Sequence, residues 1–164
     1  IQCRPMMDRW KTQTLPQQLQ SLALTLGVSC LSLQNLGAAY APEHRAWAFG
    51  MTDAYDNLVG IRLRGDKTGA KWSVRGSHSV CFVPTTDADQ MALVAEGPTD
   101  TAAGLSLGFY CVGRPSCSGG MNDLPKILKR RGVRRCVIVS DNDSPGLRGA
   151  EIFSRHIGIP NCRT

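Results

Sequence analysis

The hydrophobic pattern changes its period part-way along the chain, and this change most strongly constrains the fold. From Met91 onward, short continuous apolar runs alternate with segments of helical pattern. The predicted strands cover 92–96, 110–112 and 135–140, and the predicted helices cover 98–107, 122–131 and 145–156. Continuous apolar strands that alternate with helices are typical of a parallel sheet covered on both faces. Residues 89–164 are therefore predicted to form an α/β domain with a parallel, Rossmann-like sheet.

The residues before this domain are organised differently. Apolar residues spaced at i, i+3, i+4 and i+7 after Pro16 predict a helix that Gly27 ends, and a second short helix is expected over 30–36. Short strands separated by turn residues follow, at 47–51, 58–64, 71–75 and 80–83. This spacing predicts an antiparallel meander of hairpins. We expect an α+β subdomain with an antiparallel sheet over 15–88, and a tail or linker over 1–14.

Composition excludes some classes of protein. The hydrophobic fraction of 42% and the charged fraction of 20% are ordinary for a globular protein. No apolar run approaches the roughly 20 residues that span a bilayer, and no charged leader precedes an apolar stretch. We therefore expect a fragment of a longer cytoplasmic protein that does not enter a membrane. The net charge of +6 favours a polyanionic partner such as nucleic acid.

The cysteines indicate neither a zinc site nor a disulfide framework. The chain has 7 cysteines, with no Cys-x-x-Cys pair and no Cys/His cluster at zinc-ligand spacing. Several lie inside apolar runs, as Cys136 does. We expect them to be reduced thiols within the core.

Acidic residues follow two of the predicted parallel strands. Glu96 ends the first strand, and Asp141 and Asp143 follow the third. Because right-handed crossovers place the carboxyl ends of parallel strands along one edge of a sheet, these carboxylates are expected to converge there. Oxygen ligands of this kind suit Mg²⁺ or Mn²⁺. The pattern therefore predicts a divalent-metal site.

Each of these carboxylates also has a structural explanation. Glu96 could favour the positive end of the helix that follows it. Asp143 or Ser144 could cap the helix at Pro145, which would contribute about 1 kcal/mol to helix stability. Acidic groups at the ends of two buried strands repel one another, however, and a purely structural role would avoid that cost. Taken together, the pattern favours metal binding.

A cationic surface is predicted on the antiparallel sheet. Because side chains alternate along a strand, the basic side chains of 58–64 share one face of their strand, and those of 71–75 share one face of theirs. If the strands pair, these residues gather on one side: Arg62, Arg64, Lys71 and Arg75 on the face and Lys67 in the turn. Such a face suits the phosphates of a template strand or of nucleotides. A solvated outer face is the alternative, because half-buried sheets commonly expose Lys and Arg.

The segment from Ala92 to His156 resembles the Toprim domain of primases, topoisomerases and some nucleases. The resemblance rests on four short motifs in order: EGPTD at 96–100, GRPSCSGG at 113–120, VIVSDND at 137–143 and PGLRGA at 145–150. The preceding blocks 49–64 and 69–76 resemble the region in front of Toprim in primases of phages and mobile elements. The chain is thus similar to the catalytic core of a DNA primase.

The resemblance implies a DNA-directed RNA polymerase that makes primers by metal-dependent nucleotidyl transfer. It implies that Asp141 and Asp143 bind Mg²⁺ or Mn²⁺, and that Glu96 acts as general base or as an additional ligand. The supporting residues that it implies are Gly97, Asp100, Ser118 and Arg148. Single-stranded DNA, ribonucleoside triphosphates and a replicative helicase are the expected partners. Since primases usually continue into a further strand with more acidic residues, the resemblance also implies a domain truncated at its C-terminal end.

Two other functions remain open at this point. A Toprim nuclease would hydrolyse phosphodiesters with the same carboxylates, and the basic meander favours the primase over it. A DNA-binding module with a vestigial metal site is the non-catalytic alternative, against which the presence of Glu96, Asp141 and Asp143 argues. A topoisomerase would need a nucleophilic tyrosine, and no tyrosine has a setting that suggests one.

Overall fold

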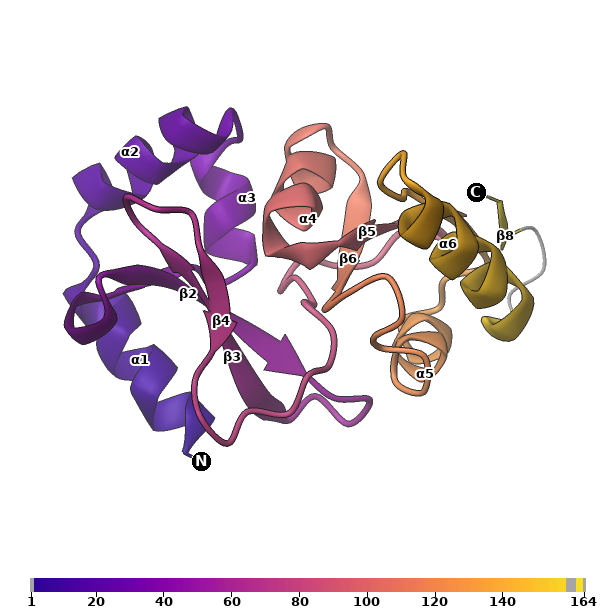
Figure 1. Cartoon of the computed structure of the whole chain (residues 1–164), viewed down its shortest axis with the longest axis horizontal. Coiled ribbons are helices and arrows are strands. Elements are labelled where there is room, and N and C mark those ends of the chain that lie inside the picture. Colours follow the sequence, from indigo (N-terminus) through magenta and orange to yellow (C-terminus); the bar gives the residue numbers. More distant parts are fainter. Residues whose placement is uncertain (1, 159–161, 164) are drawn as a thin grey trace.

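The structure is a computed structural model that describes residues 2–158 and 162–163, and it has two subdomains, each built on its own sheet (Figure 1). The first comprises α1 (Cys3–Gln13), α2 (Pro16–Leu26), α3 (Cys30–Asn35), β1 (Ala39–Ala41), the 3₁₀ helix η1 (Pro42–His44), β2 (Ala46–Thr52), β3 (Leu58–Gly65) and β4 (Lys71–Ser73). The second comprises β5 (Met91–Glu96), α4 (Gly97–Ser106), β6 (Tyr110–Arg114), α5 (Leu124–Arg130), β7 (Arg135–Ile138), α6 (Ser144–His156) and β8 (Cys162–Arg163). The predicted fold class is confirmed.

The antiparallel sheet has the strand order β1-β2-β3-β4 and is covered on both faces. One face packs against α1 through small and branched residues, among them Ala48 and Ile61. The other face carries Trp47, Phe49 and Met51 of β2, which pack under α2 and α3. Because β2 pairs with β3 in the register Phe49↔Arg62, the basic residues of β3 lie on this second face, beyond the part that the helices cover.

The expectation of a tail or linker over residues 1–14 was wrong, because α1 forms there and joins the core. Cys3, Met7 and Trp10 are buried against the sheet, at the spacing i, i+4, i+7 of one helix face. Pro5 suggested irregular structure, but it lies in the first turn, where the backbone N–H has no partner within the helix.

Two strand predictions also differ from the structure. β4 ends at Ser73 rather than at residue 75, and the predicted strand 80–83 is not part of the meander. That segment instead makes two isolated bridges, Thr52↔Cys81 with the first sheet and Phe82↔Gly113 with the second. A long-range pairing of this kind leaves no trace in the local pattern of a single segment.

The parallel sheet has the strand order β6-β5-β7-β8. Ala92, Val94 and Ile138 project into a core made with α5 and α6, and α4 packs against β5 and β6 on the opposite face. The carboxyl ends of β5 and β7 therefore meet at one edge, next to the antiparallel sheet. Within the described part of the chain, no helix is long and apolar enough to cross a membrane.

Cys3, Cys81, Cys111 and Cys136 are buried in the core as expected, whereas Cys30 and Cys117 are only half-buried. No disulfide is formed by the following described cysteines: Cys3, Cys30, Cys81, Cys111 and Cys117. Burial raises the pKa of the Cys81 and Cys111 thiols to about 12. The side chain of Cys162 lies outside the described part of the chain.

Candidate active site

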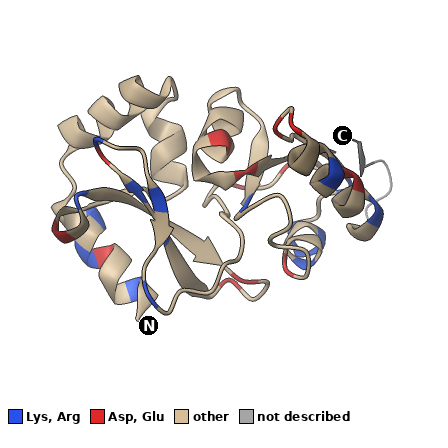
Figure 2. Cartoon of the chain, in the orientation of Figure 1, with Lys and Arg blue, Asp and Glu red and all other residues tan. Residues whose placement is uncertain are grey.

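A cleft of about 200 Å³ lies between the two sheets, and its walls carry opposite charges. Strands β3 and β4 form one wall, and the ends of β5 and β7 with the start of α4 form the other. Figure 2 shows basic residues on β3 and β4 and acidic residues around the junction of β5 and α4. The charged residues that line the cleft are Arg62, Arg64, Lys71, Glu96, Asp100 and Asp141. Gly97 also lines the cleft.

Glu96 is placed by an abrupt change from strand to helix. It is the last residue of β5, and α4 begins at the next residue, Gly97, whose φ of 78° lies in the left-handed region. A residue with a side chain would be strained in this conformation, so glycine permits the tight turn. The Oε2 atom of Glu96 is buried and has no hydrogen-bond partner among the described residues. A buried carboxylate oxygen without a partner is costly unless something else contacts it.

Asp100 and Asp141 approach the cations of the opposite wall. Burial raises the pKa of the Asp100 carboxyl; Lys71 and Arg64 act to lower this pKa, and Asp141 acts to raise it. Lys71, Arg64 and Asp141 are therefore all near enough to influence the charge of Asp100. The resemblance implied a supporting role for Asp100, and the structure places Asp100 in the cleft with Glu96.

Asp143 has a different local setting. It is the N-cap of α6, and its Oδ1 accepts a hydrogen bond of 2.7 Å from the backbone N–H of Gly146. It does not line the cleft. The capping explanation therefore describes the structure, and the metal role of Asp143 stays a prediction. Within the described residues, no group of 3 or more side chains of His, Cys, Asp or Glu is placed so that it could hold a metal ion as it stands.

The donors at the carboxylate edge nevertheless match the chemistry of a hard divalent cation. Glu96, Asp100 and Asp141 supply only oxygen, which is the ligand type that Mg²⁺ and Mn²⁺ prefer. The unpartnered Oε2 of Glu96 is available as an acceptor. The mutual repulsion of Asp100 and Asp141 would be relieved by a bound cation.

Three of the five predicted cations lie together on the cleft wall. Arg64 pairs with Lys71 and Arg62 with Ser73, so Arg62, Arg64 and Lys71 share one face. Arg62 also donates a hydrogen bond of 3.0 Å to the backbone oxygen of Pro115, which ties the two subdomains together. Lys67 and Arg75 are exposed in turns and do not line the cleft.

Ser118 and Arg148 also lie outside the cleft. Both are exposed, Ser118 in the loop after β6 and Arg148 on α6. The loop packs closely on α6, because a Cβ added at Gly149 would lie 2.5 Å from the backbone oxygen of Cys117. Their supporting roles stay predictions.

Arg114 is a residue that the sequence reasoning missed. It is the last residue of β6 and pairs with Glu96 in the parallel register, and its exposed fraction is 0%. Its Nη1 donates to the Cys117 oxygen at 2.8 Å, and its guanidinium lies 5.1 Å from the centre of the Phe153 ring. Burial lowers the pKa of Arg114, and nearby Glu96 acts to raise it. The available signal was an arginine that ends an apolar strand, as Glu96 does.

A second cavity, of about 290 Å³, adjoins the carboxylates on the α4 side of the sheet. It is lined by Glu96, Asp100 and Asp141 together with apolar residues such as Leu107 and Val139. The carboxylates therefore stand between a cationic cleft and an apolar cavity.

Comparison with known proteins bears on this arrangement. No protein-family model matches the chain, and no curated protein matches it. Solved structures do match. The Escherichia coli primase catalytic core matches with a TM-score of 0.67 and 17% identity, over 93% of this chain and 66% of that one. A DnaG primase catalytic domain matches with a TM-score of 0.67 and 16% identity, over 93% and 65%. The primase fragment of the bacteriophage T7 primase-helicase protein matches with a TM-score of 0.64 and 18% identity, over 85% and 61%.

The chain has a primase-type fold. The likeness covers both subdomains, since each of the three matches extends over 85% or more of the chain. It confirms the resemblance to Toprim primases at the level of the fold. The chain spans less than two thirds of the length of each of these three structures.

Proposed function

We propose that this primase-type fold is the catalytic core of a DNA primase, which joins ribonucleotides on a single-stranded DNA template. One observation carries the proposal: Arg62, Arg64 and Lys71 face Glu96, Asp100 and Asp141 across a single cleft. Nucleotidyl transfer needs cations for phosphate groups and carboxylates for the reacting oxygen atoms, and this cleft offers both kinds of group at once.

The cationic wall would hold phosphates. Arginine presents a planar fork of donors that matches phosphate oxygens, and lysine adds a compact positive charge. Arg62 donates to the Pro115 oxygen at 3.0 Å, whereas the hydrogen bond from Arg64 to the Gly69 oxygen is longer, at 3.5 Å, so Arg64 and Lys71 are the freer groups for a substrate. We assign them to the phosphates of the incoming nucleotide or of the template.

The carboxylate wall would act on the attacking hydroxyl. Glu96 has a buried oxygen without a partner, so it is suited to accept the proton of a primer 3′-hydroxyl. Asp100 and Asp141, with Asp143 as a further candidate, would join Glu96 in holding Mg²⁺ or Mn²⁺. When bound, such ions stabilise the negative charge that develops on the phosphoryl oxygens and on the leaving pyrophosphate.

The matched structures support the choice of partners. One of them is a DnaG catalytic domain bound to single-stranded DNA, and another comes from a primase-helicase protein. We extend both to this chain as proposals: single-stranded DNA as template, ribonucleoside triphosphates as substrates, a replicative helicase as partner, and the cytoplasm as location.

The test is a primer-synthesis gel. The chain is incubated with single-stranded DNA, labelled ribonucleotides and Mg²⁺ or Mn²⁺, beside Glu96→Gln and the control Glu151→Gln. Glu151 is exposed on α6 and lies outside the cleft. Loss of a general base typically costs about 10²- to 10⁴-fold in rate. We expect short labelled oligomers from the parent chain and the control, and none from Glu96→Gln.

The other outcomes decide between the remaining functions. Shortening of the DNA without incorporation of nucleotides would identify a nuclease that uses the same carboxylates. DNA binding without any reaction, in the parent chain as in Glu96→Gln, would favour a non-catalytic module. Oligomers made equally well by Glu96→Gln would contradict the role of Glu96.

A further inference from the structure

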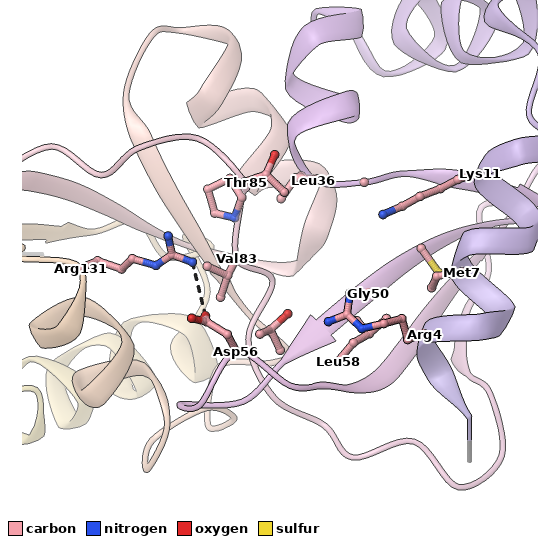
Figure 3. Close-up of a pocket in the computed structure, with 13 residues that line it drawn as sticks. Arg4, Met7, Lys11, Leu36, Gly50, Asp56, Leu58, Val83, Thr85 and Arg131 are labelled. Carbon is pink, nitrogen blue, oxygen red and sulfur yellow. Dashed lines mark hydrogen bonds and ion pairs between the residues drawn. The ribbon is translucent and has the colours of Figure 1, made fainter.

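A separate cavity of about 210 Å³ lies at the junction between the two subdomains, between α1 and the end of α5. Its walls come from α1, from the turn between β2 and β3, from the connector around Pro84 and Thr85, and from the residue after α5 (Figure 3). No residue that lines this cavity also lines the proposed active-site cleft. The cavity therefore needs an explanation of its own.

The antiparallel sheet separates this cavity from the cleft. Gly50, which lines the cavity, pairs with Ile61, and Ile61 packs on the face that α1 covers. Arg62, the next residue, points to the opposite face and lines the cleft. A group bound in one of these sites would therefore not touch the other.

Positive charge dominates the cavity. Arg4 and Lys11 reach it from α1 and Arg131 reaches it from the end of α5, whereas Asp56 is the one acidic residue that lines it. Figure 3 shows Arg4 and Lys11 on one side of the space and Arg131 on the opposite side. Asp56 is already shared: its Oδ1 lies 2.5 Å from Nη2 of Arg130 and 3.3 Å from Nη2 of Arg131. In the described part of the chain, Arg4 and Lys11 form no ion pair.

Arg131 has a donor without a partner, and the Lys11 ammonium lies close to Gly37. The Nε atom of Arg131 is buried and has no hydrogen-bond partner in the described chain. The Lys11 ammonium lies across Gly37, where an added Cβ would be 2.9 Å from Nζ. The opposite wall is held in place, because the backbone N–H of Thr85 donates to the Asn35 oxygen at 2.9 Å.

Helix dipoles explain only part of this arrangement. Lys11 lies in the last turn of α1 and Arg131 follows α5, and positive charge is favourable at both places. Arg4, however, lies in the first turn of α1, where the dipole disfavours a cation. A bound anion would account for all three cations.

We propose that this cavity binds the phosphate group of a small phosphorylated ligand, which bridges α1 of the first subdomain and the end of α5 of the second. Two guanidinium groups and one ammonium group are the side chains best suited to phosphate oxygens. A liquid water occupies roughly 30 Å³, so the cavity has room for a phosphate or pyrophosphate group with a few waters. The site goes beyond the proposed primase activity and uses none of its residues.

The test is isothermal titration of the full chain with inorganic pyrophosphate, in the presence of EDTA to prevent metal-dependent binding at the carboxylates. A second arm uses adenosine 5′-monophosphate, with adenosine as its control. The variants Lys11→Met and Arg4→Gln each remove one cation of the cavity. Lys129→Met removes an exposed cation of α5 outside the cavity. Circular dichroism checks that every variant is folded.

We expect one saturable pyrophosphate site that each cavity variant weakens by roughly tenfold, since each removes one charge-assisted hydrogen bond. Lys129→Met should leave the affinity within about twofold. Equal binding of adenosine 5′-monophosphate would identify a nucleotide as the source of the phosphate, and binding of pyrophosphate alone a free anion; both support the site.

Three results would overturn the proposal. They are the absence of saturable binding to the folded parent chain, an unchanged affinity in both Lys11→Met and Arg4→Gln, and an equal loss caused by Lys129→Met. The proposed primase activity is judged separately, because Glu96→Gln leaves the cavity unchanged. Either proposal can therefore fail while the other stands.

Discussion

The two walls of the cleft differ not only in charge but also in how the chain builds them. The cations lie within paired strands, where the register Arg64↔Lys71 and the two-residue alternation determine which face they occupy. The carboxylates lie at or after strand ends and in the first turn of α4, so their positions depend on single turns such as that at Gly97. The cationic wall is therefore robust to local change, and the carboxylate wall is sensitive to it. The chemistry is expected to depend on the more sensitive wall, and substrate binding on the more robust one.

The largest effect is expected from the carboxylate wall. Asp141→Asn removes one charge beside Asp100 and should lower the rate of primer synthesis by about 100-fold, because a lost metal contact costs several kcal/mol of charge stabilisation. Affinity for single-stranded DNA should not fall. Primer yield is measured beside filter binding of DNA. Loss of DNA binding together with activity would contradict the assignment of catalysis to the carboxylate wall and of DNA binding to the cationic wall.

The next effect is expected from the cationic wall. Arg64→Gln should weaken the binding of single-stranded DNA by about tenfold and reduce the slope of log affinity against log salt by about 0.7, because one phosphate contact is lost. Arg75→Gln is the matched comparison, because Arg75 is exposed outside the cleft. Salt titrations of both variants measure the difference. Equal losses would show that binding extends over the whole predicted basic surface.

A smaller effect separates the two explanations of Asp143. Asp143→Ala removes the cap of α6 and should lower the free energy of unfolding by about 1 kcal/mol, whereas Asp143→Ser keeps a capping oxygen and should cost much less. Urea unfolding measures both. If Asp143 also binds metal, both variants lose activity, although only one loses stability. Equal destabilisation by Ala and Ser would contradict the capping role.

The smallest effect concerns Asp100. Burial raises its pKa in the folded chain above the unfolded value of about 3.9, so the folded state binds more protons in the interval between the two values. Stability from this group therefore falls as pH rises through that interval. Asp100→Asn does not ionise and should have the higher Tm near pH 7, with the difference shrinking toward about pH 4. A difference independent of pH would point to packing instead.

The sequence predicted the cationic wall better than the carboxylate wall, for a physical reason. Strand alternation is a strict two-residue pattern, and it placed Arg62, Arg64 and Lys71 on one face as the structure does. The prediction wrongly included Arg75 in this surface, because the end of β4 depends on its pairing with β3 and not on the local pattern.

The features that the sequence reasoning missed depend on distant contacts. The strand order β6-β5-β7 brings Arg114 beside Glu96, and a segment read by itself contains no information about its neighbour. The bridges made by residues 80–83 are missed for the same reason. Helix α1 is different: the spacing of Cys3, Met7 and Trp10 carried the signal, and Pro5 obscured it.

The bridge between Phe82 and Gly113 has a mechanical consequence. The two residues exchange backbone hydrogen bonds of 2.9 Å in both directions, and the Thr52 N–H donates to the Cys81 oxygen at 2.8 Å. The segment 81–82 thus joins both sheets, and the subdomains cannot move apart without breaking these hydrogen bonds. The cleft should therefore keep a constant width and should not open and close by movement of the subdomains. The backbone amide protons of residues 52, 82 and 113 should exchange with solvent only when the fold itself opens.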